Sequence, residues 1–147
     1  DSAENDAARG SSVYVLSEKG SSEAAVRFAA RENQADSVNG VRLDNRSDVV
    51  NAILLDLSQN ESDARSREMA RLVLRELRGR MQLRTDTVQS AAFAVLKAPD
   101  VPSVLFETGY ISNSDDAAYL SSAAGRRTIA EAAARAVRSY FARRSES

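Results

Sequence analysis

The acidic residue Glu107 is the strongest candidate for a catalytic residue in this sequence. Residues 104–106 (Val-Leu-Phe) predict a buried strand, and Glu107 follows them directly. Gly109 and the small polar residues after it predict a turn. The carboxyl ends of central strands in an open α/β sheet face the ligand crevice, which makes Glu107 a candidate general base. The alternative is a structural carboxylate that caps the turn through the amides near Gly109.

The elements that must position Glu107 follow from hydrophobic periodicity and turn residues. They predict strands at residues 13–16, 91–97 and 103–107, and helices at about 21–36, 48–57, 62–80, 113–120 and 125–143. This order predicts an α/β fold, a three-layer αβα sheet with flanking helices. Three strands are few for such a fold, so we expect its N-terminal strands to lie upstream of Asp1 and to be missing here.

Two of the predicted helices carry stripes that indicate which side chains face the core. Arginines cluster on helix 62–80, but they alternate with Glu68 and Glu76, which favours a solvated face over a nucleic-acid patch. The side chains expected to point inward are Met69, Leu72, Val73 and Leu77 on that helix, and Ile129, Ala133, Ala136, Val137, Tyr140 and Phe141 on the last one.

The amino-acid composition excludes several classes of function for this chain. The chain has 147 residues, of which 43% are hydrophobic and 28% charged, which fits a single domain. Its net charge of −1 argues neither for nor against a nucleic-acid partner, and we expect none because the clustered arginines alternate with glutamates. Histidine and cysteine are absent, which excludes Ser-His-Asp and Cys-His catalysis, disulfides and an imidazole metal site built from this chain alone. No apolar run reaches the roughly 18 residues of a membrane span. The start at Asp1, without Met, indicates a mature or trimmed piece.

Five stretches of the chain resemble the zinc-dependent N-acetylmuramoyl-L-alanine amidases, the peptidoglycan hydrolases of the cell-division type. They occur in the family's order and spread over nearly the whole chain. These stretches are residues 8–17 (ARGSSVYVLS), 30–33 (AREN), 53–59 (ILLDLSQ), 92–100 (AFAVLKAPD) and 98–113 (APDVPSVLFETGYISN).

The resemblance implies a hydrolase that cleaves the amide between N-acetylmuramic acid and the L-alanine of the stem peptide, outside the cytoplasmic membrane in the periplasm. A zinc ion held by two histidines and a glutamate would activate water, and a second glutamate, which matches Glu107, would be the general base. The three zinc ligands match no residue here, since in the family they precede the segment that matches residues 1–10. We therefore expect residues 1–147 to be the C-terminal portion of the catalytic domain, inactive by itself.

The resemblance also implies a regulatory helical insert at about residues 41–61. Family members that serve cell division carry a helix that blocks the active site until an activator protein displaces it, and the apolar helix at about 48–59 fits that role. In some members an acidic residue of this insert completes the zinc shell, and Asp44 or Asp48 is the candidate here. An ordinary core helix with Asp48 as its N-cap explains the same pattern equally well.

Two other functions compete with a peptidoglycan hydrolase. The first is a metal-free, non-catalytic regulatory or peptidoglycan-binding module of the same fold. The second is a small α/β signalling or nucleotide-binding domain, which would need a glycine-rich phosphate loop after a strand. The turns at Gly20 and Gly109 lack that spacing, so this second alternative ranks low.

Overall fold

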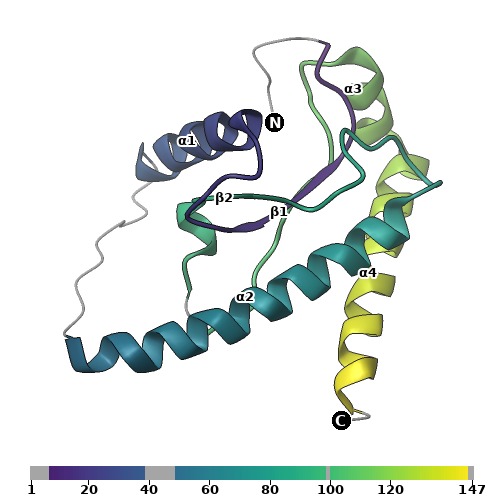
Figure 1. Cartoon of the computed structure of the whole chain (residues 1–147). Coiled ribbons are helices and arrows are strands. Elements are labelled where there is room, and N and C mark those ends of the chain that lie inside the picture. Colours follow the sequence, from purple (N-terminus) through teal and green to yellow (C-terminus); the bar gives the residue numbers. More distant parts are fainter. Residues whose placement is uncertain (1–6, 39–48, 99, 146–147) are drawn as a thin grey trace. The chain divides into compact units, whose positions relative to one another are not determined.

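The computed structural model describes residues 7–38, 49–98 and 100–145 (Figure 1). Within them, the predicted α/β class is confirmed by a three-stranded sheet of order β2-β1-β3 and four α-helices; its three-layer arrangement stays a prediction. The elements are β1 (Ser12–Leu16), α1 (Glu23–Val38), α2 (Val49–Leu77), β2 (Gln89–Ala91), the 3₁₀ helix η1 (Ala94–Leu96), β3 (Leu105–Glu107), α3 (Ser114–Ser121) and α4 (Ala123–Ser145).

The chain forms two compact units. One unit, here called the site unit, comprises the residues up to 13 together with 68–88 and those from 106 onward. The other, here called the aromatic unit, comprises residues 14–67 and 89–105. The chain passes between them inside β1, α2 and β3, so each of these elements contributes to both units.

Three rings form the core of the aromatic unit. β1 and β2 pair in parallel, with Tyr14 opposite Gln89 and Leu16 opposite Ala91, and they lie side by side in Figure 1. The ring of Tyr14 lies 5.0 Å from that of Phe28 on α1 and 5.2 Å from that of Phe93, centroid to centroid. All three side chains are buried, and aromatic pairs at such spacings add to the free energy gained from burial alone.

Asn33 on α1 clamps the chain that follows β2. Its Nδ2 donates to the carbonyl of Ala92 at 2.8 Å, and its Oδ1 accepts from the amide of Ala94 at 2.7 Å. One side chain thus supplies both a donor and an acceptor to backbone that has left the sheet.

The strand predicted at residues 91–97 is wrong beyond Ala91. The chain forms the short β2 and then turns into η1. Phe93 and Leu96 are buried and Val95 is exposed, a spacing that the 3₁₀ turn provides and an alternating strand does not. The hydrogen bonds to Asn33 replace the ladder bonds that a continued strand would have made.

The two helices predicted at 48–57 and 62–80 are a single helix, α2, which ends at Leu77. The polar residues 58–61 contain neither glycine nor proline, so nothing interrupts the backbone hydrogen bonds there. The buried Ser66 ties this part of α2 to the segment before β3: its Oγ accepts from the amide of Ser103 at 2.8 Å and donates to the Ser62 carbonyl of its own helix at 2.7 Å.

Ion pairs join α2 to α4 in the site unit. Glu76, whose side chain is 12% exposed, accepts from Arg75 at 2.9 Å and from Arg135 of α4 at 3.0 Å. Glu68 binds Arg144 at 2.9 Å in the same way. Glu68 and Glu76 of α2 therefore bind the neighbouring helix, which differs from the solvated face predicted for them. The predicted burial of Leu72, Val73 and Leu77 is confirmed, whereas Met69 is half-buried.

The inward stripe of α4 differs in part from the prediction. Ala136 and Tyr140 are buried as expected, but Val137 and Phe141 are 43% and 62% exposed. The buried set is instead Gly125, Ala132, Ala136 and Tyr140, mostly small residues that allow close helix packing. At Gly125 an added Cβ would lie 2.0 Å from the carbonyl oxygen of Tyr119 on α3, so only glycine fits this approach of α3 and α4.

Within the described ranges, no helix combines the length and the apolar character that crossing a membrane requires.

We predict that Asn33→Ala lowers the free energy of unfolding by about 2–4 kcal/mol, because the Ala92 carbonyl and the Ala94 amide both lose their partner. Urea denaturation measures the change. Gln34→Ala, at a more exposed position of the same helix, is the matched control and should change stability by at most about 0.5 kcal/mol. Equal stabilities of the two variants would show that the two hydrogen bonds of Asn33 do not stabilise the fold.

We predict that Glu76 makes stability depend on pH. The hydrogen bond from Arg75, which outweighs the opposing effect of burial, and the interaction with Arg135 lower the pKa of Glu76 below its usual 4.5. The unfolded chain therefore binds a proton first as the pH falls, so the stabilisation is full above about pH 4.5 and is lost as pH falls through the folded-state pKa. Urea midpoints of wild type and Glu76→Gln should differ at neutral pH and converge in acid. A difference that stays constant would refute this.

Candidate functional site

Glu107 is the last residue of β3 and is half-buried. The prediction of a strand at residues 103–107 is confirmed for Leu105–Glu107 only, and the expectation that residues 104–106 are fully buried is wrong, because each of them is half-buried. β3 is an end strand in the order β2-β1-β3, so among the described residues it has a strand neighbour on one side only.

The backbone that follows Glu107 is held at three successive residues. The carbonyl of Thr108 accepts a hydrogen bond from Ser11 Oγ at 2.8 Å. Gly109 packs so closely on Asp116 that an added Cβ would lie 3.1 Å from Oδ2 of that carboxylate. The amide of Tyr110 donates to the same Oδ2 at 2.9 Å.

Asp116 is the most deeply buried acid among the described residues, at 7% exposure. Its Oδ2 also accepts from the amide of Gly10, at 2.8 Å, so one oxygen joins the start of β1 to the turn after β3. Gly10 has φ of +93° and its Cβ position lies 2.6 Å from the amide nitrogen of Arg84, two reasons why this position requires glycine.

The first turn of α3 orients Asp116. Asn113 is the N-cap, and its side chain accepts from the amides of Asp115 and Asp116 at 3.1 Å each. The two aspartates lie at the positive end of the helix, where negative charge is stabilised. Arg9 binds Asp115 through Nη1 at 3.1 Å, and its Nε lies 3.8 Å from Oδ1 of Asp116.

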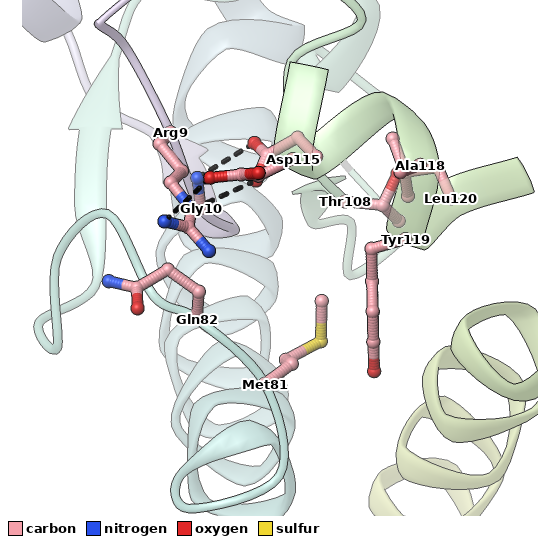
Figure 2. Close-up of a pocket in the computed structure, with 10 residues that line it drawn as sticks. Arg9, Gly10, Met81, Gln82, Thr108, Asp115, Ala118, Tyr119 and Leu120 are labelled. Carbon is pink, nitrogen blue, oxygen red and sulfur yellow. Dashed lines mark hydrogen bonds and ion pairs between the residues drawn. The ribbon is translucent and has the colours of Figure 1, made fainter. Parts of the chain in front are cut away.

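A cavity of about 510 Å³ lies against this turn within the site unit (Figure 2). Figure 2 shows Arg9 with its guanidinium toward Asp115 on one side, and the side chains of Met81 and Tyr119 on the other. A charged pair and an apolar wall thus share one space. Glu107 is not among the lining residues, although its neighbour Thr108 is. The lining is Arg9, Gly10, Met81, Gln82, Thr108, Asp115, Asp116, Ala118, Tyr119 and Leu120.

The other predicted site residues lie outside the described part of the structure. Asp44 and Asp48 belong to residues 39–48, and the apolar side chains from Val49 to Leu57 are also not described. Among the residues that are described, no three His, Cys, Asp or Glu side chains come together as a metal site would require. The chain as a whole contains no histidine or cysteine.

The role of Asp116 is what sequence reasoning missed. Asp115 and Asp116 both lie in the first turn of the helix, so the sequence predicts for both the same role, a favourable interaction with the helix dipole. In the structure only Asp116 points inward. The spacing of Asn113 and Asp116, N-cap and third helical residue, is that of a capping box and could have signalled a second role. Its two amide partners, six and 106 positions away, carry no sequence signal.

Known proteins match nearly the whole chain. The family model Amidase_3, described as N-acetylmuramoyl-L-alanine amidase, matches residues 1–139. The amidase AmiA of Escherichia coli (strain K12) is 38% identical over 138 residues, which are 93% of this chain and 48% of that protein. AmiA of Salmonella typhimurium is 37% identical over the same length, and AmiC of Neisseria meningitidis serogroup B is 40% identical over 135 residues, 32% of its length.

The chain spans about half the length of the AmiA relatives that it matches, and about a third of that of AmiC. The matches cover β1, α1 and the turn after β3 alike, as expected for a shared fold rather than a shared motif. On this agreement between a family model and several relatives, the chain belongs to the N-acetylmuramoyl-L-alanine amidase family.

Proposed function

We propose that this chain, residues 1–147, is the C-terminal portion of the catalytic domain of a peptidoglycan hydrolase. The reaction is cleavage of the amide between N-acetylmuramic acid and the L-alanine of the stem peptide, in cell-wall remodelling and daughter-cell separation. The family match over residues 1–139 carries this proposal. Peptidoglycan lies outside the cytoplasmic membrane, and with the regulatory helix described below we propose that the protein acts in the periplasm.

In this proposal Glu107 is the general base. It takes a proton from the attacking water and returns it to the nitrogen of the leaving L-alanine, so its carboxylate ends the cycle unprotonated. Two observations support the role: Glu107 is the final residue of a strand, and the three residues after it are held by Ser11 and Asp116. A base held by fixed backbone needs little reorganisation to reach the reacting atoms.

The residues of this chain do not fit the zinc site that the family resemblance implies. Biological zinc sites take three or four ligands from His, Cys, Asp and Glu. The chain has no histidine or cysteine, and the acids in its described part form no cluster of three. We propose that zinc belongs to the complete enzyme, with its main ligands on polypeptide other than this chain.

A regulatory role for residues 41–61 is also part of the proposal. An activator protein would displace the helix at about 48–59, with Asp44 or Asp48 as the acid that reaches the metal in the blocked state. Because α2 runs without interruption from Val49 to Leu77, such a displacement has to bend α2 or move its N-terminal part as one piece.

A metal-free regulatory or peptidoglycan-binding module of the same fold is the second candidate, and the absence of histidine and cysteine favours it. The two candidates differ in one outcome. The complete gene product releases stem peptides from purified peptidoglycan if it is the hydrolase, and binds without releasing them if it is the module.

We predict that Glu107→Gln in the complete gene product lowers peptide release from purified peptidoglycan at least about 100-fold, because the amide cannot accept the proton. The melting temperature should change little, since the two side chains have the same shape. Glu131→Gln removes an acid that is 58% exposed on α4 and is the matched control, with activity within about twofold of wild type. Activity of Glu107→Gln at the level of that control would refute the assignment.

We predict that the 147-residue chain alone binds no zinc stoichiometrically, because the donors of a three- or four-ligand site are missing from its composition. Isothermal titration of the metal-free chain with zinc chloride measures this, with the complete gene product as the positive reference. One tight site on the chain alone would show that its own acids, Asp44 and Asp48 among them, suffice.

A further inference from the structure

The carboxylate of Asp116 links two backbone segments that flank the candidate base. Its Oδ2 accepts from Gly10, two residues before β1, and from Tyr110, three residues after Glu107. Both hydrogen bonds are buried and short, at 2.8 and 2.9 Å. Bonds from two amides to one ionised oxygen are stronger than bonds between neutral groups.

The contacts of Asp116 leave the exit from β3 little freedom. A Cβ on Gly109 would lie 3.1 Å from the carboxylate and 3.3 Å from Cδ1 of Leu120 on α3, so no side chain fits between the turn and α3 without displacing one of them. Ser11, the residue after Gly10, holds the carbonyl of Thr108. Movement of Asp116 would therefore release Gly10, Gly109 and Tyr110 together, and with them the end of the strand that carries Glu107.

Asp116 is itself fixed from two sides. The Asn113 cap holds its amide at 3.1 Å, and Nε of Arg9 lies 3.8 Å from its other oxygen, Oδ1. Its neighbour Asp115 has a different environment: its side chain is 67% exposed and its ion pair with Arg9 lies at the surface. Two adjacent acids with the same charge in the same helical turn thus differ in burial and in contact with the turn after β3.

We propose that Asp116 is a positioning residue for Glu107, which sets the direction of its side chain by fixing the turn from Thr108 to Tyr110. The inference rests on the proposed role of Glu107 as general base. Asp116 does not touch the substrate in this scheme and acts only through the backbone. Its loss should therefore lower kcat and leave KM nearly unchanged.

The test uses three variants of the complete gene product. Asp116→Ala removes both hydrogen bonds and should lower kcat about 30- to 100-fold, the scale on which misplacing a catalytic group by about 1 Å acts. Asp116→Asn keeps one carbonyl oxygen that both amides can reach, with a weaker hydrogen bond than the carboxylate gives, and should lower kcat only about three- to tenfold. Glu131→Gln, which removes an acid of α4 that is 58% exposed, is the control for charge, with kcat within about twofold of wild type. KM should change less than about threefold in all three.

A second measurement reports the geometry directly. Amide hydrogen exchange at Gly10 and Tyr110 should be faster in Asp116→Asn than in wild type, and unchanged in Glu131→Gln. If Asp116→Ala does not fold, the Asn variant decides. Faster exchange at these amides with unchanged kcat, or a loss of kcat matched by an equal rise in KM, overturns the positioning role.

Glu107→Gln measured beside these variants separates the two proposals. If it is active, the general-base role of Glu107 fails, and the positioning role fails with it. If it is inactive while Asp116→Ala and Asp116→Asn keep the wild-type kcat, the positioning role fails alone and the proposed function stands.

Discussion

The buried carboxylate of Asp116 is the interaction on which the site unit depends. A charged group at 7% exposure is costly to remove from water unless it is fully hydrogen-bonded. Here the cost is offset by the amides of Gly10 and Tyr110 and by the nearby guanidinium of Arg9. Removing any partner would leave a buried charge or a buried amide unsatisfied, so the arrangement is stable only as a whole.

A second constraint couples α2 and α4 through charge. Two of the residues that α4 buries, Ala132 and Ala136, contribute little apolar area, and ion pairs link the long side chains of the two helices. Glu76 and Glu68 are held by arginines of α4. An arginine-rich helix can look like a nucleic-acid surface in the sequence. In this chain the neighbouring helix binds the acids that alternate with those arginines.

Local signals in the sequence predict most elements. β1, α1, α3 and α4 have strong caps or periodicity, and Asn113 is recognisable as the cap of α3 from its position alone. The misses have non-local causes. Residues 94–96 leave the sheet because Asn33, about 60 positions earlier, satisfies the backbone beside them. The predicted stripe of α4 is partly wrong because Val137 and Phe141 lie one residue beyond Ala136 and Tyr140, and helical periodicity alone does not choose between adjacent stripes.

In the candidate site, too, local sequence signals predict one residue and miss another whose role depends on non-local contacts. A glutamate at the end of an apolar segment is visible in the sequence, so the residue pattern alone is enough to propose Glu107. The pattern does not reveal Asp116, since its partners are identified only by folding. The two carboxylates lie nine positions apart and differ in environment: Glu107 is half-buried at a strand end, and Asp116 is buried behind the turn. A general base must reach the substrate, and in the proposed mechanism the half-buried Glu107 at the strand end meets that condition. Asp116 is buried and its Oδ2 holds the amides of Gly10 and Tyr110, so in this turn the two tasks fall to two different side chains.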